Sequence, residues 1–316
     1  MVRGLAFFLF LATSAFAQPY PAKPTRIVVA FPAGGIADLY ARVLGARIGE
    51  AWGQPVVVEN RAGAGGVIAA EFVAKSPADG YTLCMCSVGT HAVNVSLFSK
   101  LPYDALRDFA PVALVLEAEG LLVVHPSVPV RSIAELIRHA GENPGKLSFA
   151  SAGMGTASHL AGELFKIMAK VEMTHVPYKG NVPAITDLLA GQTSLLFATM
   201  PTVLPHAKAG KLRVLATIGA ARSAATPELP TVGESLPGFE VNNWIALFAP
   251  AGTPAEVVRR WNGEVARVMQ SKEIEARLPV EGARFTPNTP EQFAGFVKSE
   301  IAKWAPVVKA SGARAD

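Results

Sequence analysis

Short apolar runs rich in β-branched residues alternate along this chain with longer segments whose apolar residues recur at helical spacing. The first run lies at 26–31, and the order of run and helical segment is repeated twice more in the first third of the sequence. Parallel strands need crossover connections, which are usually helices, so this βαβαβα order predicts a parallel sheet covered on both faces. The alternation therefore places the chain in the α/β class.

The same alternation starts again after a pair of predicted strands near residue 120, which indicates two α/β units. The predicted strands lie at 26–31, 54–59, 81–87, 112–115, 120–124, 147–150, 174–176, 194–198, 214–218 and 243–249. The predicted helices lie at 38–51, 63–75, 132–141, 158–170, 182–190, 254–269, 274–278 and 290–309, with one more after Gly89. Because the last three helices have no complete set of strands of their own, we expect them to pack on the first unit.

The size and charge of the chain agree with two globular units. Its 316 residues are enough for two domains, since a domain takes about 150 residues. Half of the residues are hydrophobic and only 17% are charged, which excludes a disordered chain. The formal net charge of +4 is not concentrated in any stretch. We therefore expect no nucleic-acid partner.

The first 17 residues have the composition of a signal peptide. Arg3 precedes an apolar run at 5–12, and Ala15-Phe16-Ala17 is a small-x-small cleavage pattern. A membrane anchor is the alternative interpretation, but the run is shorter than the roughly 20 residues that span a bilayer. We predict cleavage before Gln18 and export to the periplasm.

Neither the cysteines nor the histidines predict a metal or a cofactor. Cys84 and Cys86 share one face of a predicted strand, and a bond between them would close a strained ring, so we expect two buried thiols. The six histidines lack metal-ligand spacing. The glycines at 153 and 155 resemble a dinucleotide fingerprint, but the third glycine and the acidic residue that should follow are missing.

Three glycine-rich turns join predicted strands to predicted helices, at 31–38, 87–91 and 150–159. Ligands of open α/β sheets bind at such turns, where free amides and the positive ends of helix dipoles attract anions. The hydroxyls of the third turn add donors that suit a carboxylate. Glycines also end strands and cap helices in any α/β protein, and Asp38 suits an ordinary helix start. The turns alone leave both interpretations open.

Longer motifs extend over nearly the whole chain after residue 30. They are FPAGGIAD at 31–38, VENRAGAGG at 58–66, PADGYTL at 77–83, ASHLAGELF at 157–165, VPYKG at 176–180, DLLAG at 187–191, LPTV at 229–232 and FAPAGTP at 248–254. As a set, in this order, they resemble the Bug family, the extracytoplasmic solute receptors of tripartite tricarboxylate transporters.

The resemblance implies a two-lobed type II periplasmic-binding fold, a Venus flytrap whose lobes close on a small organic carboxylate. It implies a first lobe of 18–121 plus 246–316, a second of 122–245, and hinges near 118–124 and 241–248. We expect a monomer without catalytic activity that delivers its ligand to the permease subunits of a membrane transporter. The residues implied for the cleft are Phe31, Gly34, Gly35, Asp38, Ser87, Thr90, His91, Ser151, Gly155, Thr156, Ser158, Tyr178 and Thr199.

The sequence departs from the family pattern at two places. Ile36 and Ala37 stand where many members carry a small or hydroxylated pair, and Ala198 stands where members often carry an acidic residue. The second departure argues against a ligand with an ammonium group and favours a dicarboxylate or an aromatic carboxylate.

Two other functions are weighed against this interpretation. One is an exported hydrolase that uses Ser151 or Ser158 with His159 or His91, although the chain has no Gly-x-Ser-x-Gly elbow. The other is an orphan sensory receptor of the same fold.

Overall fold

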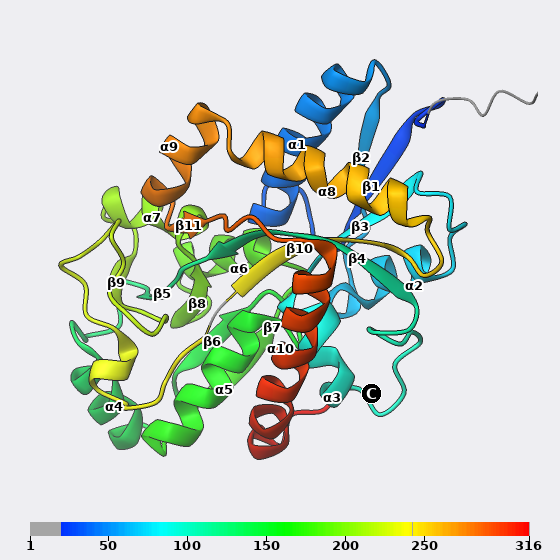
Figure 1. Ribbon diagram of the computed structural model, residues 1–316. Helices are drawn as coiled ribbons and strands as arrows, with labels where there is room; N and C mark the ends of the chain where they lie inside the picture. The colour runs from blue at the N-terminus through cyan, green and yellow to red at the C-terminus, as the bar shows by residue number, and fades with distance from the viewer. Residues whose placement is uncertain (1–19, 242, 316) are drawn as a thin grey trace, which may run out of the picture.

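Two mixed sheets form the centres of two α/β lobes in the computed structural model, which describes residues 20–241 and 243–315 (Figure 1). The strand order is β11-β4-β10-β3-β1-β2 in the first sheet and β7-β6-β8-β5-β9 in the second. The predicted signal peptide and its cleavage site lie outside the described residues. Among the described residues, every helix is too short or too polar to cross a bilayer.

The first lobe is assembled from both ends of the chain. Its strands are β1 Thr25–Val29, β2 Val56–Asn60, β3 Thr82–Ser87, β4 Phe109–Ala118, β10 Asn243–Pro250 and β11 Ala283–Arg284. Its helices are α1 Ile36–Trp52, α2 Val67–Ala74, α3 Asn94–Leu97, α8 Ala255–Met269, α9 Lys272–Val280 and α10 Pro290–Ser311, with short helical turns η1 Ala64–Gly66 and η2 Gly89–Val93.

The second lobe comes from the middle of the chain. Its strands are β5 Gly120–Val124, β6 Ser148–Ser151, β7 Thr174–Pro177, β8 Leu195–Thr199 and β9 Arg213–Thr217. Its helices are α4 Ile133–Glu142, α5 Ala157–Ala169, α6 Asn181–Leu189 and α7 Met200–Lys208, with the 3-10 turn η3 Val232–Glu234. The predicted α/β class and the two units are confirmed.

The first sheet confirms the predicted parallel order of its early strands and corrects the expectation of a wholly parallel sheet. Strands β2 and β3 pair in parallel with β1, with Ile27 opposite both Val58 and Leu83. Strand β10 lies between β3 and β4 and is antiparallel to both. Strand β10 follows all the strands of the second lobe in the sequence, so the order of elements did not predict that it pairs with β3 and β4.

The chain passes between the sheets at Glu119 and again between β9 and β10. The predicted lobe boundaries at 121/122 and 245/246 fall inside β5 and β10, each of which belongs to one sheet along its whole length. The first crossing is therefore a single residue between two strands.

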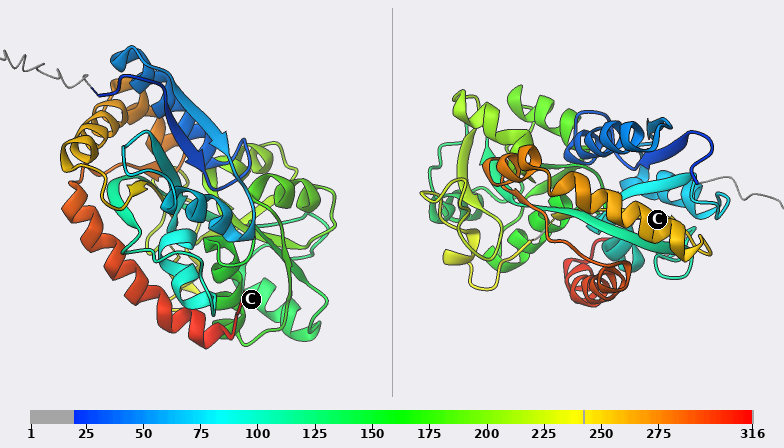
Figure 2. Two further views of the ribbon diagram at one scale, coloured as in Figure 1. Left: turned by 90° about the vertical axis from the view of Figure 1, so that its right-hand side faces the viewer. Right: turned by 45° about the horizontal axis from the view of Figure 1, so that its top comes forward.

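Core packing also joins the lobes. The largest cluster of buried apolar side chains includes Val28 of β1, Phe149 of β6 and Trp304 of α10. Helix α10 packs on β4 and η2 of the first lobe and on α5 of the second. Figure 1 and the left view of Figure 2 show it running along the molecule. The last three helices thus return to the first lobe as predicted, and α10 continues onto the second.

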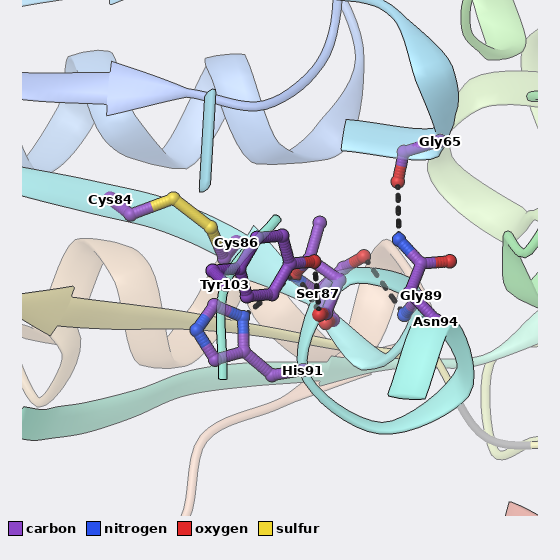
Figure 3. Close-up of a disulfide and its surroundings, with 9 residues drawn as sticks. Gly65, Cys84, Cys86, Ser87, Gly89, His91, Asn94 and Tyr103 are labelled. Atoms are coloured by element: carbon purple, nitrogen blue, oxygen red, sulfur yellow. Dashed lines mark hydrogen bonds between the residues drawn. A yellow bond between two sulfur atoms is a disulfide. The ribbon is translucent and has the colours of Figure 1, made fainter. Parts of the chain in front are cut away.

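Cys84 and Cys86 form a disulfide within β3, which corrects the expectation of two free thiols (Figure 3). Their Cα atoms are 5.5 Å apart, a separation that suits a disulfide. Both residues are fully buried, and β3 continues from them directly to Ser87. The bridge therefore lies in the strand that carries one of the predicted ligand-binding turns.

Candidate functional site

A cavity of about 70 Å³ lies between the lobes, at the carboxyl ends of the parallel strands. The first lobe lines it with Phe31, Pro32, Gly35, Ile36, Ala37 and Ser87, and the second with Ala152, Thr156, Ala157, Ser158, Asn181 and Val182. The remaining lining residues lie beside the two crossings and are Gly120, Phe197, Ala198, Thr199, Ile218, Asn243 and Ile245. We call the twelve residues contributed by the two lobes the helix pole, and the seven residues beside the crossings the hinge pole.

The helix pole collects helix N-termini from both lobes. Helix α1 starts at Ile36 after Gly35, and α5 starts at Ala157 after Thr156; neither has a side-chain cap. The first amides of a helix have no acceptor inside the helix, and here they border the same cavity. Helix α6 begins there too, at Asn181, a residue that the sequence analysis did not single out.

Asp38 holds the first of these turns in shape. Its carboxylate accepts hydrogen bonds from the Gly34 amide (2.9 Å), from Asn60 Nδ2 (2.9 Å) and from Arg42 Nε (3.0 Å). Burial alone would raise the pKa of Asp38, but the bonds from Arg42, Gly34 and Asn60 together lower it below its usual value. Asp38 therefore stays ionised, and its charge is balanced by Arg42 within α1. The Arg42 partner was not foreseen from the sequence.

The turn at 150–159 uses most of its own donors internally. Ser158 Oγ accepts from the Ala152 amide (2.9 Å), and Ser151 Oγ accepts from the Gly153 amide (3.1 Å). The Gly155 amide donates to His159 Nδ1 at 3.2 Å. The amides that remain for a ligand are thus those of the first turn of α5, at Ala157 and Ser158, and not that of Gly155.

A pair of stacked histidines supports this turn from behind. The rings of His159 and His175 are 4.3 Å apart, and His175 Nε2 lies 2.6 Å from Ser151 Oγ. Burial lowers the pKa of His159 to about 4, with a smaller effect from the charge of Lys166. Burial lowers the pKa of His175 to about 3, with smaller effects from His159 and Lys166. Both rings are therefore neutral at physiological pH, and His159 can serve as an acceptor.

The turn at 87–91 contributes Ser87 to the cavity, and its other polar groups point into the protein. Thr90 Oγ1 donates to the Ser87 carbonyl (2.9 Å), and the His91 ring stacks on Phe248 at 3.7 Å. His91 is fully buried, and burial lowers its pKa to about 3. Figure 3 shows the His91 ring below the end of β3, on the same side as Tyr103. Thr90 and His91 are thus buried residues that stabilise the turn and do not line the cavity.

The hinge pole is apolar and uncharged. Phe197, Ile218 and Ile245 are each at most 3% exposed, and Phe197 belongs to an aromatic cluster with Phe165 and Phe239. Its polar side chains are those of Thr199 and Asn243. Among the described residues that line either pole, none carries a charge.

The predicted site residues divide into two groups. Those that line the cavity are Phe31, Gly35, Ser87, Thr156, Ser158 and Thr199. Those that are not part of its lining are Gly34, Asp38, Thr90, His91, Ser151, Gly155 and Tyr178. Tyr178 lines a separate hollow and donates to Asp187 at 2.7 Å. Of the lining residues that were missed, Asn181 follows a strand-to-helix turn and was detectable by that signal. Gly120, Ile218 and Asn243 are brought in by the crossings, which have no local motif.

The chain matches the model of the tripartite tricarboxylate transporter family receptor over residues 40–313. It is 40% identical to protein BugT of Bordetella pertussis (strain Tohama I) over 322 aligned positions, which cover 99% of each chain.

Two similar solved structures are of proteins with a carboxylate ligand. "R. palustris Rpa4515 with adipate" has a TM-score of 0.90 and 39% identity, covering 93% of this chain and 98% of that one. MatC (Rpa3494) from Rhodopseudomonas palustris with bound malate has a TM-score of 0.87 and 35% identity, covering 92% and 100%. The two-lobed fold, the motifs and these similarities agree, and the chain belongs to the tripartite tricarboxylate transporter receptor family, as does the Bug protein it resembles.

Proposed function

We propose that this protein is a periplasmic solute receptor that captures a small organic carboxylate in the cavity between its lobes. The observation that carries the proposal is the meeting of the uncapped N-termini of α1 and α5, one from each lobe, at one cavity with no charged lining residue. Each helix end favours an anion by about 0.3–1 kcal/mol. Hydrogen bonds to a charged group add about 1.5–3 kcal/mol each.

Asn181 adds capacity for a ligand at the helix pole. Its Oδ1 is buried and has no hydrogen-bond partner among the described residues. A carboxylate has no proton to give this oxygen, so a water or a ligand hydroxyl group must satisfy it, while the Nδ2 group of the same side chain can donate to a carboxylate. Adipate and malate, bound by two related receptors, are both carboxylates. We expect the present ligand to be a small organic carboxylate, delivered by the monomeric receptor to permease subunits in the membrane.

No catalytic step is part of this proposal. Ser158 Oγ and His159 Nδ1 each accept a hydrogen bond from a backbone amide. Ser151 does meet a histidine, His175, but the pair lies behind the cavity lining and Ser151 is fully buried. A serine nucleophile needs both a base and access to substrate. A sensory receptor of the same fold would bind the same ligand and differ only in its membrane partner.

Asn181→Asp tests the site. A carboxylate at this position would repel an anionic ligand, so we expect binding of the carboxylate found by a thermal-shift screen to weaken at least tenfold, measured by titration calorimetry. Gln192→Glu adds the same charge at an exposed position of the same lobe and should bind like the wild type. If sugars or polyamines stabilise the mature protein and no carboxylate does, the proposed function is wrong.

A further inference from the structure

The two poles of the cavity offer a ligand different chemistry. Across the first sheet, the lining runs from the end of β1 past Ser87 of β3 to Ile245 of β10, which are neighbouring strands in that order. Across the second, it runs from the start of α6 after β7, through the β6 and β8 ends, to β5 and β9 at the crossings. The N-termini of α1, α5 and α6 therefore border one end of the cavity, and the crossings and the start of α7 border the other. The first amides of α7 are not free for a ligand, because the Met200 amide donates to the Glu119 carbonyl and Pro201 has no amide hydrogen.

The hinge pole cannot neutralise a second carboxylate. Phe197, Ile218 and Ile245 present apolar side chains there, and Ala198 is a methyl group that is 3% exposed. The neutral groups of Thr199 and Asn243 are the polar side chains of this end. A carboxylate enclosed by such a lining loses its hydration and gains no opposite charge, which is the costly arrangement for an ion.

Cations on neighbouring elements are already paired. Arg284 of β11 lies beside the first crossing, and its Nε is 2.9 Å from Glu117 Oε2. Lys303 of α10 lies 3.6 Å from Glu240 on the chain segment that leads to the second crossing. Both pairs are made without any ligand, so neither cation is left over for a distal carboxylate.

The space available also favours a compact ligand. A cavity of about 70 Å³ corresponds to about two water molecules at their liquid volume of about 30 Å³ each. An apolar group in the hinge pole would replace such waters next to Phe197 and Ile218, where water finds few hydrogen-bond partners. Expelling poorly bound water with an apolar group increases affinity.

From these observations we propose that the ligand is a compact monocarboxylate with an aliphatic or aromatic body, its carboxylate at the helix pole and its apolar end at the hinge pole. The proposal rests on the function proposed above, and it separates this receptor from relatives whose solved structures hold the dicarboxylates adipate and malate. The uncharged hinge pole is the specificity determinant. It admits a methyl or phenyl group and rejects a second carboxylate.

Matched pairs of ligands test the proposal, because the members of each pair differ only at the distal end. Butyrate and succinate, hexanoate and adipate, and benzoate and terephthalate would each be titrated into the mature protein by calorimetry. We expect at least one monocarboxylate to bind at least tenfold more tightly than its dicarboxylate partner. If the dicarboxylate of every pair that binds is equal or tighter, the inference is wrong although the carboxylate receptor stands. If neither member of any pair binds and no other carboxylate does, the proposed function itself fails.

A positive charge introduced at the hinge pole provides a second test of the proposal. Asn243 lines this pole and is only partly buried, so it can be replaced with less disturbance than Ile218. We expect Asn243→Arg to shift the preference at least tenfold toward the dicarboxylate of the same pair. Gln192→Arg, which adds the same charge at an exposed position of the second lobe, should keep the wild-type preference. Should Asn243→Arg fold, as shown by circular dichroism, and still prefer the monocarboxylate to the same degree, the hinge pole does not determine specificity.

Discussion

Gly155 lies at the point where the second lobe touches α3 of the first. Its φ is +76°, and a Cβ there would lie 2.2 Å from Asn94 Oδ1 and 2.7 Å from Leu97 Cδ2. We therefore expect Gly155→Ala to strain the turn and to press the lobes apart. Binding of the carboxylate should weaken at least tenfold in calorimetry, and stability should fall by about 1–3 kcal/mol in denaturant unfolding.

Gly263 in α8 supplies the control for this substitution. A Cβ at Gly263 would meet nothing within 4 Å, so Gly263→Ala should leave binding unchanged and stabilise the protein by up to about 1 kcal/mol. Wild-type affinity in Gly155→Ala would show that close approach of the lobes at this residue is not needed for binding.

The stacked histidines make stability depend on pH in a defined direction. Burial lowers the pKa of His159 to about 4 and that of His175 to about 3, whereas both titrate near about 6.5 in the unfolded chain. Between these values the unfolded state binds more protons than the folded state. The free energy of unfolding should therefore fall as the pH is lowered from about 6.5 to about 4.

Melting temperatures measured across this pH range check the prediction. His159→Gln retains a side-chain acceptor for the Gly155 amide and does not titrate, so its melting temperature should depend less steeply on pH than that of the wild type. Equal slopes for the two proteins would mean that His159 takes up no proton on unfolding.

At the scale of elements, the start of α1 depends on a charge that the helix itself balances. Asp38→Asn replaces one acceptor oxygen of the carboxylate with an amide NH₂ group, which is a donor. This group would face the donors of Gly34, Asn60 and Arg42, so at least one of their hydrogen bonds would be lost. Because Arg42 is half exposed, water replaces part of the lost ion pair. We expect a loss of about 1–3 kcal/mol in urea unfolding and moderately weaker ligand binding.

Glu50→Gln, at an exposed position near the end of the same helix, should change stability by less than about 0.5 kcal/mol. If Asp38→Asn binds the anionic ligand much more tightly than the wild type, Asp38 repels the ligand and its role as an organiser of the turn is wrong.

Elements with a strong periodic pattern were predictable from sequence, and those set by tertiary contacts were not. Helix α5 and strand β3 lie within one or two residues of their predicted bounds. Helix α7 was missed because Pro201 and Pro205 interrupt its pattern; Pro201 lies in the first turn, where its missing amide is not needed. The two residues of β11 are too short for any periodic signal.

The candidate site was predictable to the extent that local motifs build it. The glycine-rich turns led to the helix pole, because a strand end followed by a helix start is visible in sequence. The same turns also predicted Thr90 and His91 for the cleft, but both side chains are fully buried in the protein. No local sequence pattern tells whether a side chain at such a turn faces the cleft or the core. The hinge pole joins Gly120 to Ile218, which are hydrogen bonded to each other through the backbone at 2.9 Å. Such pairings between distant segments follow only from the folded topology.

At the scale of the whole molecule, ligand binding should be coupled to movement of the lobes. The two crossings form the hinge pole, and a ligand that touches both lobes binds the closed state more strongly than an open one. We expect the radius of gyration from small-angle X-ray scattering to decrease when a bound carboxylate is added. Gly155→Ala should show a larger radius without ligand, and an unchanged wild-type radius at saturation would contradict closure.

The position of β10 between β3 and β4 has a consequence for the order in which the molecule assembles. The first lobe cannot complete its sheet until residues 243–250 have been made, by which time all the strands of the second lobe are present. Pairings between segments so far apart in sequence form slowly. Strands β1, β2 and β3 can pair with one another early, but the edges of β3 and β4 that pair with β10 stay open until the rest of the chain has been synthesised.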